Sequence, residues 1–327
     1  MSQSKLREKI AQEFVNSLNE DRIPWKAAWA AERPYNATTD KDYNGLNSLW
    51  LSYVAGQKGY TDPRWATFKQ AKDHNWNVRK GEHGTQIEFW SMYDTKNRKN
   101  LSMSEARGII KAEPEREKDF VPNSKCYTVF NAEQLDGIPK LAERQSTIDI
   151  EAVRGQRDTL IKNMGLTFVE GGNEAYYKGL RDTITMPPDT AFESTYEYMA
   201  TFLHEASHAT GHPSRLRRDL GGKFGSEKYA KEELRAEISS AMLSQTLGFG
   251  TDLCAEMTNH KAYVQSWAQV IKDKPTELFA AIKDAENICD YLIEKGQFQL
   301  PERAQTAPEM APEERAVQTL EKPHKVR

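Results

Sequence analysis

Two histidines and a glutamate within a five-residue stretch carry the clearest chemical signal in this chain. His204 and His208 stand four positions apart, and Glu205 directly follows the first of them. Residues four apart on a helix share one face, so both imidazoles can reach one metal ion while the carboxylate lies beside it. This H-E-x-x-H spacing is typical of zinc hydrolases. It predicts a Zn²⁺ site with His204 and His208 as ligands and Glu205 as the catalytic general base.

The residues around the motif predict the helix that this spacing requires. Ser194 and Glu197 form a capping-box pattern at its start, and Gly211 suits its C-terminal end. Apolar side chains recur between them at helical spacing, at Tyr196, Met199, Phe202, Leu203, Ala206 and Ala209. The two histidines of the motif should therefore project from a partly buried helix. His212 follows Gly211, so we expect it in a loop, where it could contact substrate.

A catalytic zinc site also needs a third protein ligand and an open position for water. An acidic second helix is predicted at residues 226–247, and Glu233 and Glu237 stand one turn apart on it. Their order resembles that in glutamate-type zincins, in which a ligand glutamate is followed four residues later by a group that hydrogen-bonds a ligand histidine. We expect Glu233 to bind the metal and Glu237 to be the outer partner; the reverse order and Glu232 stay open as alternatives. Tyr229, one turn before Glu233, is a candidate oxyanion-stabilising group.

The composition favours a two-domain protein of the cytoplasm. The chain has 327 residues, and its net charge of −3 does not by itself indicate nucleic-acid binding. Six of its seven tryptophans nevertheless lie in residues 1–90, and residues 1–140 carry 22 Lys and Arg against 19 Asp and Glu. The three cysteines are scattered without C-x-x-C spacing, so they indicate neither a disulfide framework nor a thiolate zinc site, and a reducing compartment fits. No signal-peptide pattern or run of transmembrane length is present, so we predict a soluble cytoplasmic protein without a membrane partner.

The first half of the chain alternates short helices and strands, which predicts an α+β module. We expect helices at residues 5–20, around 49–54 and from 65 to about 74, and strands at 85–90 and 125–131. A polar, charged insert at about 94–123 is predicted to be helical or disordered.

The second half predicts a mostly helical domain with a small sheet. Gly171, Gly172 and Asn173 predict a hairpin turn between two strands. The other predicted segments are a linker at 137–147, a helix near 148–163, a strand at 182–186, helices at about 255–272 and 275–295, and a disordered tail at 299–327. The chain is thereby divided into domains at 1–136 and 148–298.

Successive blocks of the first half resemble the N-terminal domain of ArdC-type antirestriction proteins, a domain that also opens some plasmid primases of the TraC type. The blocks are Pro24-Trp25, Pro34-Tyr35-Asn36, Tyr43-Asn44-Gly45-Leu46-Asn47, Arg64 to Ala71, Arg79-Lys80-Gly81-Glu82 and Val129 to Gln134. The second half resembles the metallopeptidase domain of the same family, at His204 to Leu216, Tyr229 to Glu237 and Asn259 to Trp267. The resemblance covers nearly all of residues 5–295, whereas the charged insert and the tail match no part of the family pattern.

This resemblance implies that the first domain is an α+β module that binds single-stranded DNA and that the second is a zincin-like metallopeptidase. Aromatic rings can stack on bases, and Lys and Arg can follow the phosphates. The expected stacking residues, which lie beside turns or prolines, are Trp25, Trp29, Tyr35 and Trp76. The expected phosphate-binding residues are Arg64, Lys69, Lys72, Arg79 and Lys80. Trp50, Tyr53 and Phe68 lie at helical spacing and are expected in the core.

The leading hypothesis is an antirestriction-type protein that binds single-stranded DNA, carries a zinc-dependent peptidase site for an unknown protein or peptide, and protects incoming mobile-element DNA. The alternative is a protein that coats single-stranded DNA and whose metal site is structural or vestigial. An open fourth coordination position would argue against a structural zinc. Primase or nuclease activity is poorly supported, because no cluster of Asp residues suits two-metal chemistry.

Overall fold

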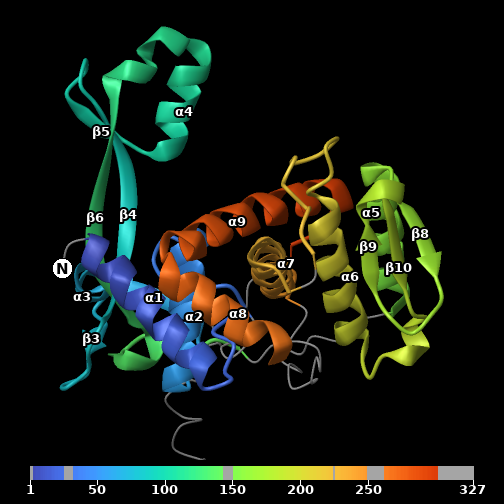
Figure 1. The fold of residues 1–327 in the computed structure, drawn as a ribbon. Coiled ribbons are helices and arrows are strands. Elements are labelled where there is room, and N and C mark those ends of the chain that lie inside the picture. Colours follow the sequence, from blue (N-terminus) through green and yellow to red (C-terminus); the bar gives the residue numbers. More distant parts are fainter. Residues whose placement is uncertain (1–2, 26–31, 143–149, 224, 249–260, 301–327) are drawn as a thin grey trace, which may run out of the picture.

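A five-stranded sheet and a body of long helices with a second, smaller sheet make up the fold (Figure 1). The structure is a computed structural model that describes residues 3–25, 32–142, 150–223, 225–248 and 261–300. Its mixture of helices and sheets confirms the predicted α+β class. Trp29 and the predicted tail beyond residue 300 lie outside the described residues, as do the first residues of the helix predicted at 255–272.

The larger sheet is built around one long antiparallel pair of strands. Strand β4 (Thr85–Asp94) stays in register with β6 (Phe120–Asn131), from Thr85 opposite Val129 to Asp94 opposite Phe120. The strand order is β1-β2-β6-β4-β5, with β1 at Tyr35–Asn36, β2 at Arg64–Thr67 and β5 at Lys99–Leu101. A separate pair joins β3 (Asn77–Val78) to β7 (Leu135–Asp136). Both strands predicted in this half exist, and both are longer than predicted.

The helix predicted to begin at Trp65 was wrong in its first residues. Residues 64–67 form β2, and only then does helix α3 (Phe68–Asp73) begin. Trp65 is fully buried, and the backbone of β2 pairs with β6. Thr67 ends the strand and caps the helix, because its side chain accepts a hydrogen bond from the Gln70 N–H. In a strand of only four residues, the alternation of apolar and polar residues is too short to be recognised in the sequence next to a helix.

Strands β4 and β6 continue beyond the rest of the sheet as a projecting arm, which we define as residues 89–127 (Figure 1). The insert predicted to be helical or disordered forms the end of this arm, with β5, helix α4 (Met103–Ala112) and a 3-10 turn at Pro114–Asp119. Leu101, Ala106 and Phe120 make a small apolar core there. Buried Asp94 accepts two hydrogen bonds from Arg116, at 2.9 and 2.8 Å. The arm end is therefore ordered by its own core and ion pair.

The main apolar core is continuous between the two halves of the chain. Helices α1 (Gln3–Asn19) and α2 (Gly45–Lys58) contact α8 (Lys261–Asp273) and α9 (Thr276–Gly296), and their side chains join one buried cluster with those of the later helices. Trp25 is buried in this cluster, with its ring centroid 6.4 Å from that of Phe14 and 5.5 Å from that of Trp267. The first two helices thus pack as part of the helical body, although the predicted boundary assigns them to the first domain.

The helical body carries the small sheet on one side (Figure 1). Its helices are α5 (Ile150–Met164), α6 (Thr195–Ala209), α7 (Glu227–Thr246), α8 (Lys261–Asp273) and α9 (Thr276–Gly296). The sheet has the order β8-β10-β9, with β8 at Thr167–Glu170, β9 at Tyr176–Lys178 and β10 at Thr183–Met186. The predicted hairpin at 171–173 was therefore wrong, because β10 inserts between the two strands that this turn connects.

Candidate metal centre

Helix α6 presents both motif histidines from a buried scaffold. It begins after Ser194, whose hydroxyl accepts a hydrogen bond from the Glu197 N–H at 3.1 Å, and it ends at Ala209. Glu197 accepts from the Glu193 N–H instead of completing a capping box. The apolar face predicted for this helix is buried at Met199, Phe202, Leu203, Ala206 and Ala209. Packing of this face fixes the direction in which the opposite face points.

Helix α7 supplies the carboxylates. It is capped by Ser226, whose hydroxyl accepts a hydrogen bond from the Tyr229 N–H at 3.2 Å. The Ser240 hydroxyl donates to the Ala200 carbonyl at 2.9 Å, which fastens α7 to α6. Glu232, Glu233 and Glu237 are all buried against α6, at 3–8% exposed surface. Buried carboxylates at a helix interface require cationic or metal partners.

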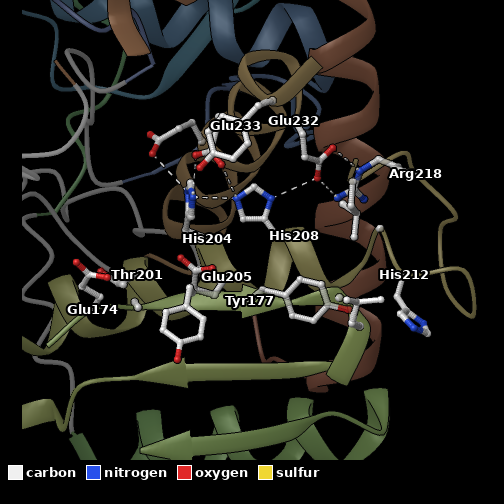
Figure 2. A pocket seen from close by; sticks show the side chains of 18 of the residues that line it. Glu174, Tyr177, Thr201, His204, Glu205, His208, His212, Arg218, Glu232 and Glu233 are labelled. Atoms are coloured by element: carbon white, nitrogen blue, oxygen red, sulfur yellow. Dashed lines mark hydrogen bonds and ion pairs between the residues drawn. The ribbon is translucent and has the colours of Figure 1, made fainter. Parts of the chain in front are cut away.

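Three ligand-type groups converge at this interface (Figure 2). The Nε2 atoms of His204 and His208 lie 3.2 Å apart. The Glu233 carboxylate faces both, with Oε2 3.6 Å from His204 Nε2 and Oε1 3.3 Å from His208 Nε2. One atom of each residue lies within 4.8 Å of the others, which suits a single ion. Two imidazoles and one carboxylate match the ligand set of catalytic zinc sites.

Each histidine has a second carboxylate behind it, on the Nδ1 side of the ring. Glu237 Oε1 lies 3.4 Å from His204 Nδ1, an atom that is buried and makes no hydrogen bond within the described residues. Glu232 Oε1 lies 3.4 Å from His208 Nδ1. Such outer carboxylates orient a metal-bound imidazole and increase its basicity. The geometry therefore favours Glu233 as the ligand and places both Glu237 and Glu232 behind the histidines.

Arg218 holds Glu232 in place and was missed by the sequence reasoning. Its guanidinium donates to Glu232 Oε1 at 2.7 Å, to the Ser207 carbonyl at 2.7 Å and to the Thr210 hydroxyl at 2.6 Å. It therefore links the end of α6 to the start of α7. The adjacent Glu232 and Glu233 could have indicated that such an arginine exists. Neighbouring residues on a helix cannot both face the same ion, so the carboxylate that does not bind the metal needs another cation.

The proton equilibria show how the cluster balances its charge. Burial lowers the pKa of His208, but contacts with Glu232 and Glu233 outweigh it and raise the pKa to about 10. The pKa of His204 is also raised, because its carboxylate neighbours outweigh burial. Burial acts to raise the pKa of Glu233, yet hydrogen bonds from both histidines hold it well below its usual value. The site thus draws positive charge to its carboxylates, and a divalent cation can supply that charge in place of the protons.

The centre opens into a cleft of about 1340 Å³. Glu205 is 7% exposed, lies beside His204 and lines this cleft without belonging to the three converging ligand groups (Figure 2). Tyr229 also lines the cleft, as does strand β9 through Tyr176 and Tyr177. His212 lies at the rim, apart from the two histidines, with its Nδ1 atom 2.7 Å from the Ser214 hydroxyl.

A second group that the sequence reasoning missed positions the small sheet against α6. Arg215 donates to Asp182 at 3.0 Å through Nη1 and again through Nη2, and to the Ala209 carbonyl at the end of α6 at 2.7 Å. Asp182 also accepts a hydrogen bond from the Tyr177 hydroxyl at 2.7 Å. Burial and the neighbouring carboxylate raise the pKa of Tyr177, so this hydroxyl stays protonated. These contacts set the distance of β9 from the histidines.

Three of the residues predicted to bind DNA are buried, and this corrects the prediction. Trp25 and Tyr35 are 1% and 3% exposed, so neither ring can stack on a base. The Arg64 side chain pairs with Asp62 at 2.7 Å, donates to the Pro139 carbonyl at 2.7 Å and is buried, so it is not accessible to a phosphate. Adjacent prolines and turns do not indicate whether a ring is exposed. Trp29 lies outside the described residues.

The remaining predicted DNA-contact residues lie together between residues 69 and 80. Lys69 and Lys72 are exposed on α3, and Lys80 is exposed after β3. Arg79 is exposed, although it donates to the Glu133 carbonyl and lies 3.7 Å from Glu82. Trp76 is half-buried against His74. Trp50 and Tyr53 are buried as expected, whereas Phe68 is 59% exposed and the prediction of a core position was wrong.

The architecture is that of a zincin-like metallopeptidase domain preceded by a smaller α+β region, and comparison with known proteins agrees. Residues 155–284 match the zincin-like metallopeptidase family, and residues 4–130 match the N-terminal domain of the anti-restriction factor ArdC. Solved structures of the antirestriction protein ArdC from plasmid R388, one metal-free and one bound to Mn(II), are 31% identical with a TM-score of 0.67. They cover 90% of this chain, which in turn covers 98% and 99% of theirs. The chain belongs to the family of ArdC-type antirestriction proteins.

Other relatives extend this comparison. The DNA primase TraC of Escherichia coli is 38% identical over 305 residues, and a second TraC is 37% identical over 304. The chain spans only 20% and 28% of the length of these primases. The protein y4eC of Sinorhizobium fredii (strain NBRC 101917 / NGR234) is 32% identical over 273 residues, which are 84% of its length. Among the described residues of this chain, no helix is both long and apolar enough to cross a membrane.

Proposed function

We propose that this chain protects incoming mobile-element DNA in the cytoplasm by binding single-stranded DNA and by cutting a protein at a metal site. The convergence of His204, His208 and Glu233 beside Glu205 in an open cleft carries the peptidase part of the proposal. The DNA part rests on the family of the N-terminal region and on the exposed cations between residues 69 and 80.

His204, His208 and Glu233 would hold the ion, and their donor set suits Zn²⁺. The related R388 protein binds Mn(II), so the preferred metal of this chain is itself open to test. When bound, the ion supplies Lewis acidity, which polarises a water molecule and the carbonyl of the scissile peptide bond. Glu205 takes the proton from the water and passes it to the leaving nitrogen. Tyr229 is placed in the cleft, where its hydroxyl can donate to the carbonyl oxygen as negative charge develops on it.

The substrate is proposed to be an extended stretch of polypeptide. Strand β9 stands at one end of the small sheet and lines the cleft, so one of its edges is unpaired within that sheet. An extended peptide can add to such an edge as another strand, held by main-chain hydrogen bonds. Leu180, Phe192 and Leu220 give the cleft apolar walls for the side chains of that peptide.

The exposed Lys69, Lys72, Arg79 and Lys80, with half-buried Trp76, are proposed to contact single-stranded DNA. Lys and Arg pair with phosphates, and the ring can stack on a base. Such binding weakens as salt increases, because neutralised phosphates release counterions. A linear decrease of log affinity with log salt is therefore expected for the whole protein.

The substitution Glu205→Gln tests the peptidase proposal. It removes the base but no proposed ligand, so the protein should keep its metal and its DNA affinity while cleavage of an unfolded protein substrate falls about 10²- to 10⁴-fold. Glu174→Gln makes the same chemical change at an exposed position of the cleft and should leave cleavage unchanged.

Protection of transferred DNA from restriction in cells should be lost together with cleavage. Full protection by Glu205→Gln would instead favour the alternative, in which the protein coats single-stranded DNA and the metal site is structural or vestigial. Undiminished cleavage by a metal-loaded Glu205→Gln protein would refute the assigned base.

A further inference from the structure

The two faces of the arm are covered to different extents. Successive side chains of a strand point to opposite faces, and residues paired across an antiparallel ladder share a face. At the arm end, Met92, Leu101 and Phe120 share one face, and the helix α4 residues Ala106, Ile109 and Ile110 pack against it. At the arm base, Ile87 and Val129 lie on the other face and pack against Leu51 and Ala55 of α2. Beyond Ile87, the large apolar side chains of this second face belong to none of the apolar clusters of the described residues.

We define the open face as the side chains of the arm that continue this second face. They are Phe89, Ser91, Tyr93, Val121, Asn123, Lys125 and Tyr127. The four large apolar side chains among them are exposed, at 51% for Phe89, 36% for Tyr93, 50% for Val121 and 42% for Tyr127. A row of exposed rings and apolar groups on one face of a projecting ribbon is costly in water unless a partner covers it.

The rings on the open face are adjacent in space. Phe89 lies opposite Lys125, and its ring centroid is 5.9 Å from that of Tyr127, with the ring planes at 85°. Tyr93 lies opposite Val121 toward the arm end. The ribbon therefore carries aromatic surface at two levels along its length, with an exposed lysine beside the first.

The open face itself carries one charged side chain, and its charge is positive. None of its seven residues is acidic, and Lys125 has no carboxylate partner among the described residues. The turn that follows Asp94 carries exposed Lys96 and Arg98, and exposed Lys99 begins β5 opposite Asp94, one residue from the Asn100 that pairs with Tyr93. An anionic partner with flat apolar groups complements such a surface. Single-stranded DNA has both features, because its bases offer π-faces and its backbone carries the charge.

We propose that the open face of the arm is a platform on which bases of single-stranded DNA stack, while Lys125 and the cationic turn at 95–99 contact the phosphates. The proposal rests on the DNA binding proposed above and adds a base-stacking surface on the arm to the cations between residues 69 and 80. The ribbon that carries this face projects from the rest of the sheet (Figure 1).

The test uses the full chain, a fluorescein-labelled oligothymidine and fluorescence anisotropy at fixed salt. Phe89→Ala and Tyr127→Ala remove exposed rings, and each should weaken binding by about 5- to 150-fold, the range typical of lost base stacking. Tyr127→Phe keeps the ring and should bind as the wild type does. Lys125→Glu should weaken binding and reduce its salt dependence.

Val169→Ala is the control, because Val169 is an exposed apolar side chain on β8, outside both the open face and residues 69–80. Unchanged binding by Val169→Ala, together with a loss in the arm variants, supports the proposal. Unchanged binding by the arm variants, with a loss on changing Phe68, Lys69 and Lys72, would place the DNA site on α3 and overturn the proposal while leaving DNA binding itself intact. A wild-type chain without affinity for oligothymidine would overturn the DNA-binding function as well.

Self-association is the competing explanation for exposed rings, and sedimentation velocity separates it. A dimeric wild type that becomes monomeric in Phe89→Ala, with unchanged DNA affinity, would identify the open face as an interface between two copies and overturn the proposal.

Discussion

The metal centre and the arm are built on opposite principles. At the metal centre, the side chains of two helices are buried against one another, and each of the two histidines has a carboxylate behind it. On the open face of the arm, the large apolar side chains are exposed, whereas helix α4 covers the opposite face at the arm end. A buried cluster of charges specifies its own partner, because each group must be compensated. An exposed face specifies only the chemistry of what would cover it.

The two regions are nevertheless parts of one body. The arm grows from a sheet whose base is covered by α1 and α2, and these helices share their core with α7, α8 and α9. Gln245 on α7 donates to the Ser52 hydroxyl on α2 at 3.0 Å, and Glu286 on α9 accepts from the Gly45 N–H at 2.6 Å. Substitutions in the shared core, at the metal centre and on the arm therefore test how far the two regions depend on each other.

The largest effect is expected from Trp25→Ala, which removes a buried ring from the core shared by the two halves. Its ring contacts Phe14 within the first half of the sequence and Trp267 in the second half. Losing them should lower the free energy of unfolding by about 3–5 kcal/mol, measured by urea denaturation. The matched substitution Trp76→Ala, at a half-buried ring outside this core, should lower the free energy of unfolding by less. A smaller loss in Trp25→Ala than in Trp76→Ala would show that the halves are stabilised independently.

Features set by the spacing within one helix, such as the metal centre, could be predicted from the sequence. His204, Glu205 and His208 could be placed because one helix sets their spacing, and Glu233 because a second helix repeats the argument. The prediction for Phe68 was wrong because it assumed a helix that begins at Trp65 and buries Phe68. The chain instead changes from strand to helix after Thr67, and Phe68 is exposed.

Other features could not be predicted because they depend on contacts between distant segments. Trp25 meets a tryptophan far along the chain, and Arg218 meets Glu232 across a loop. The open face exists only because helices cover the neighbouring parts of the ribbon. Spacing within one element carries no information about such coverage.

The next largest effect separates the three glutamates of α7. Glu233→Ala removes a proposed ligand and should abolish stoichiometric metal binding. Glu237→Ala removes an outer partner of His204 and should weaken metal affinity by about 10- to 100-fold. Titration with Zn²⁺ against a competing chelator measures both. Retained binding in Glu233→Ala with loss in Glu237→Ala would exchange the two roles.

A smaller effect on the same site is expected from Arg218→Ala, which acts on His208 only through Glu232. Without the guanidinium, Glu232 loses its hydrogen bonds at 2.7 and 3.3 Å and the outer support of His208 is loosened. Metal affinity should decrease by about 10-fold, at the low end of outer-shell effects. Arg217→Ala is the control, since this neighbouring arginine is exposed and donates only to the Pro213 carbonyl among the described residues. Equal metal affinities in the two variants would show that Arg218 does not support the metal site.

The smallest effect concerns the end of the arm and is confined to acid pH. Burial acts to raise the pKa of Asp94, but hydrogen bonds from Asn97 and Arg116 outweigh it and lower the pKa to about 2. Since the folded pKa lies below the usual aspartate value of about 4, the ion pair contributes its full stability above pH 4 and loses it as the pH falls toward 2. Protection of amide hydrogens at residues 95–119 should decrease over that range. In Asp94→Asn, which cannot titrate, the protection should be lower at neutral pH and should not change between pH 4 and 2. A wild-type arm whose protection follows that of α6 and α7 across the same range would show instead that the arm end has no local stability of its own.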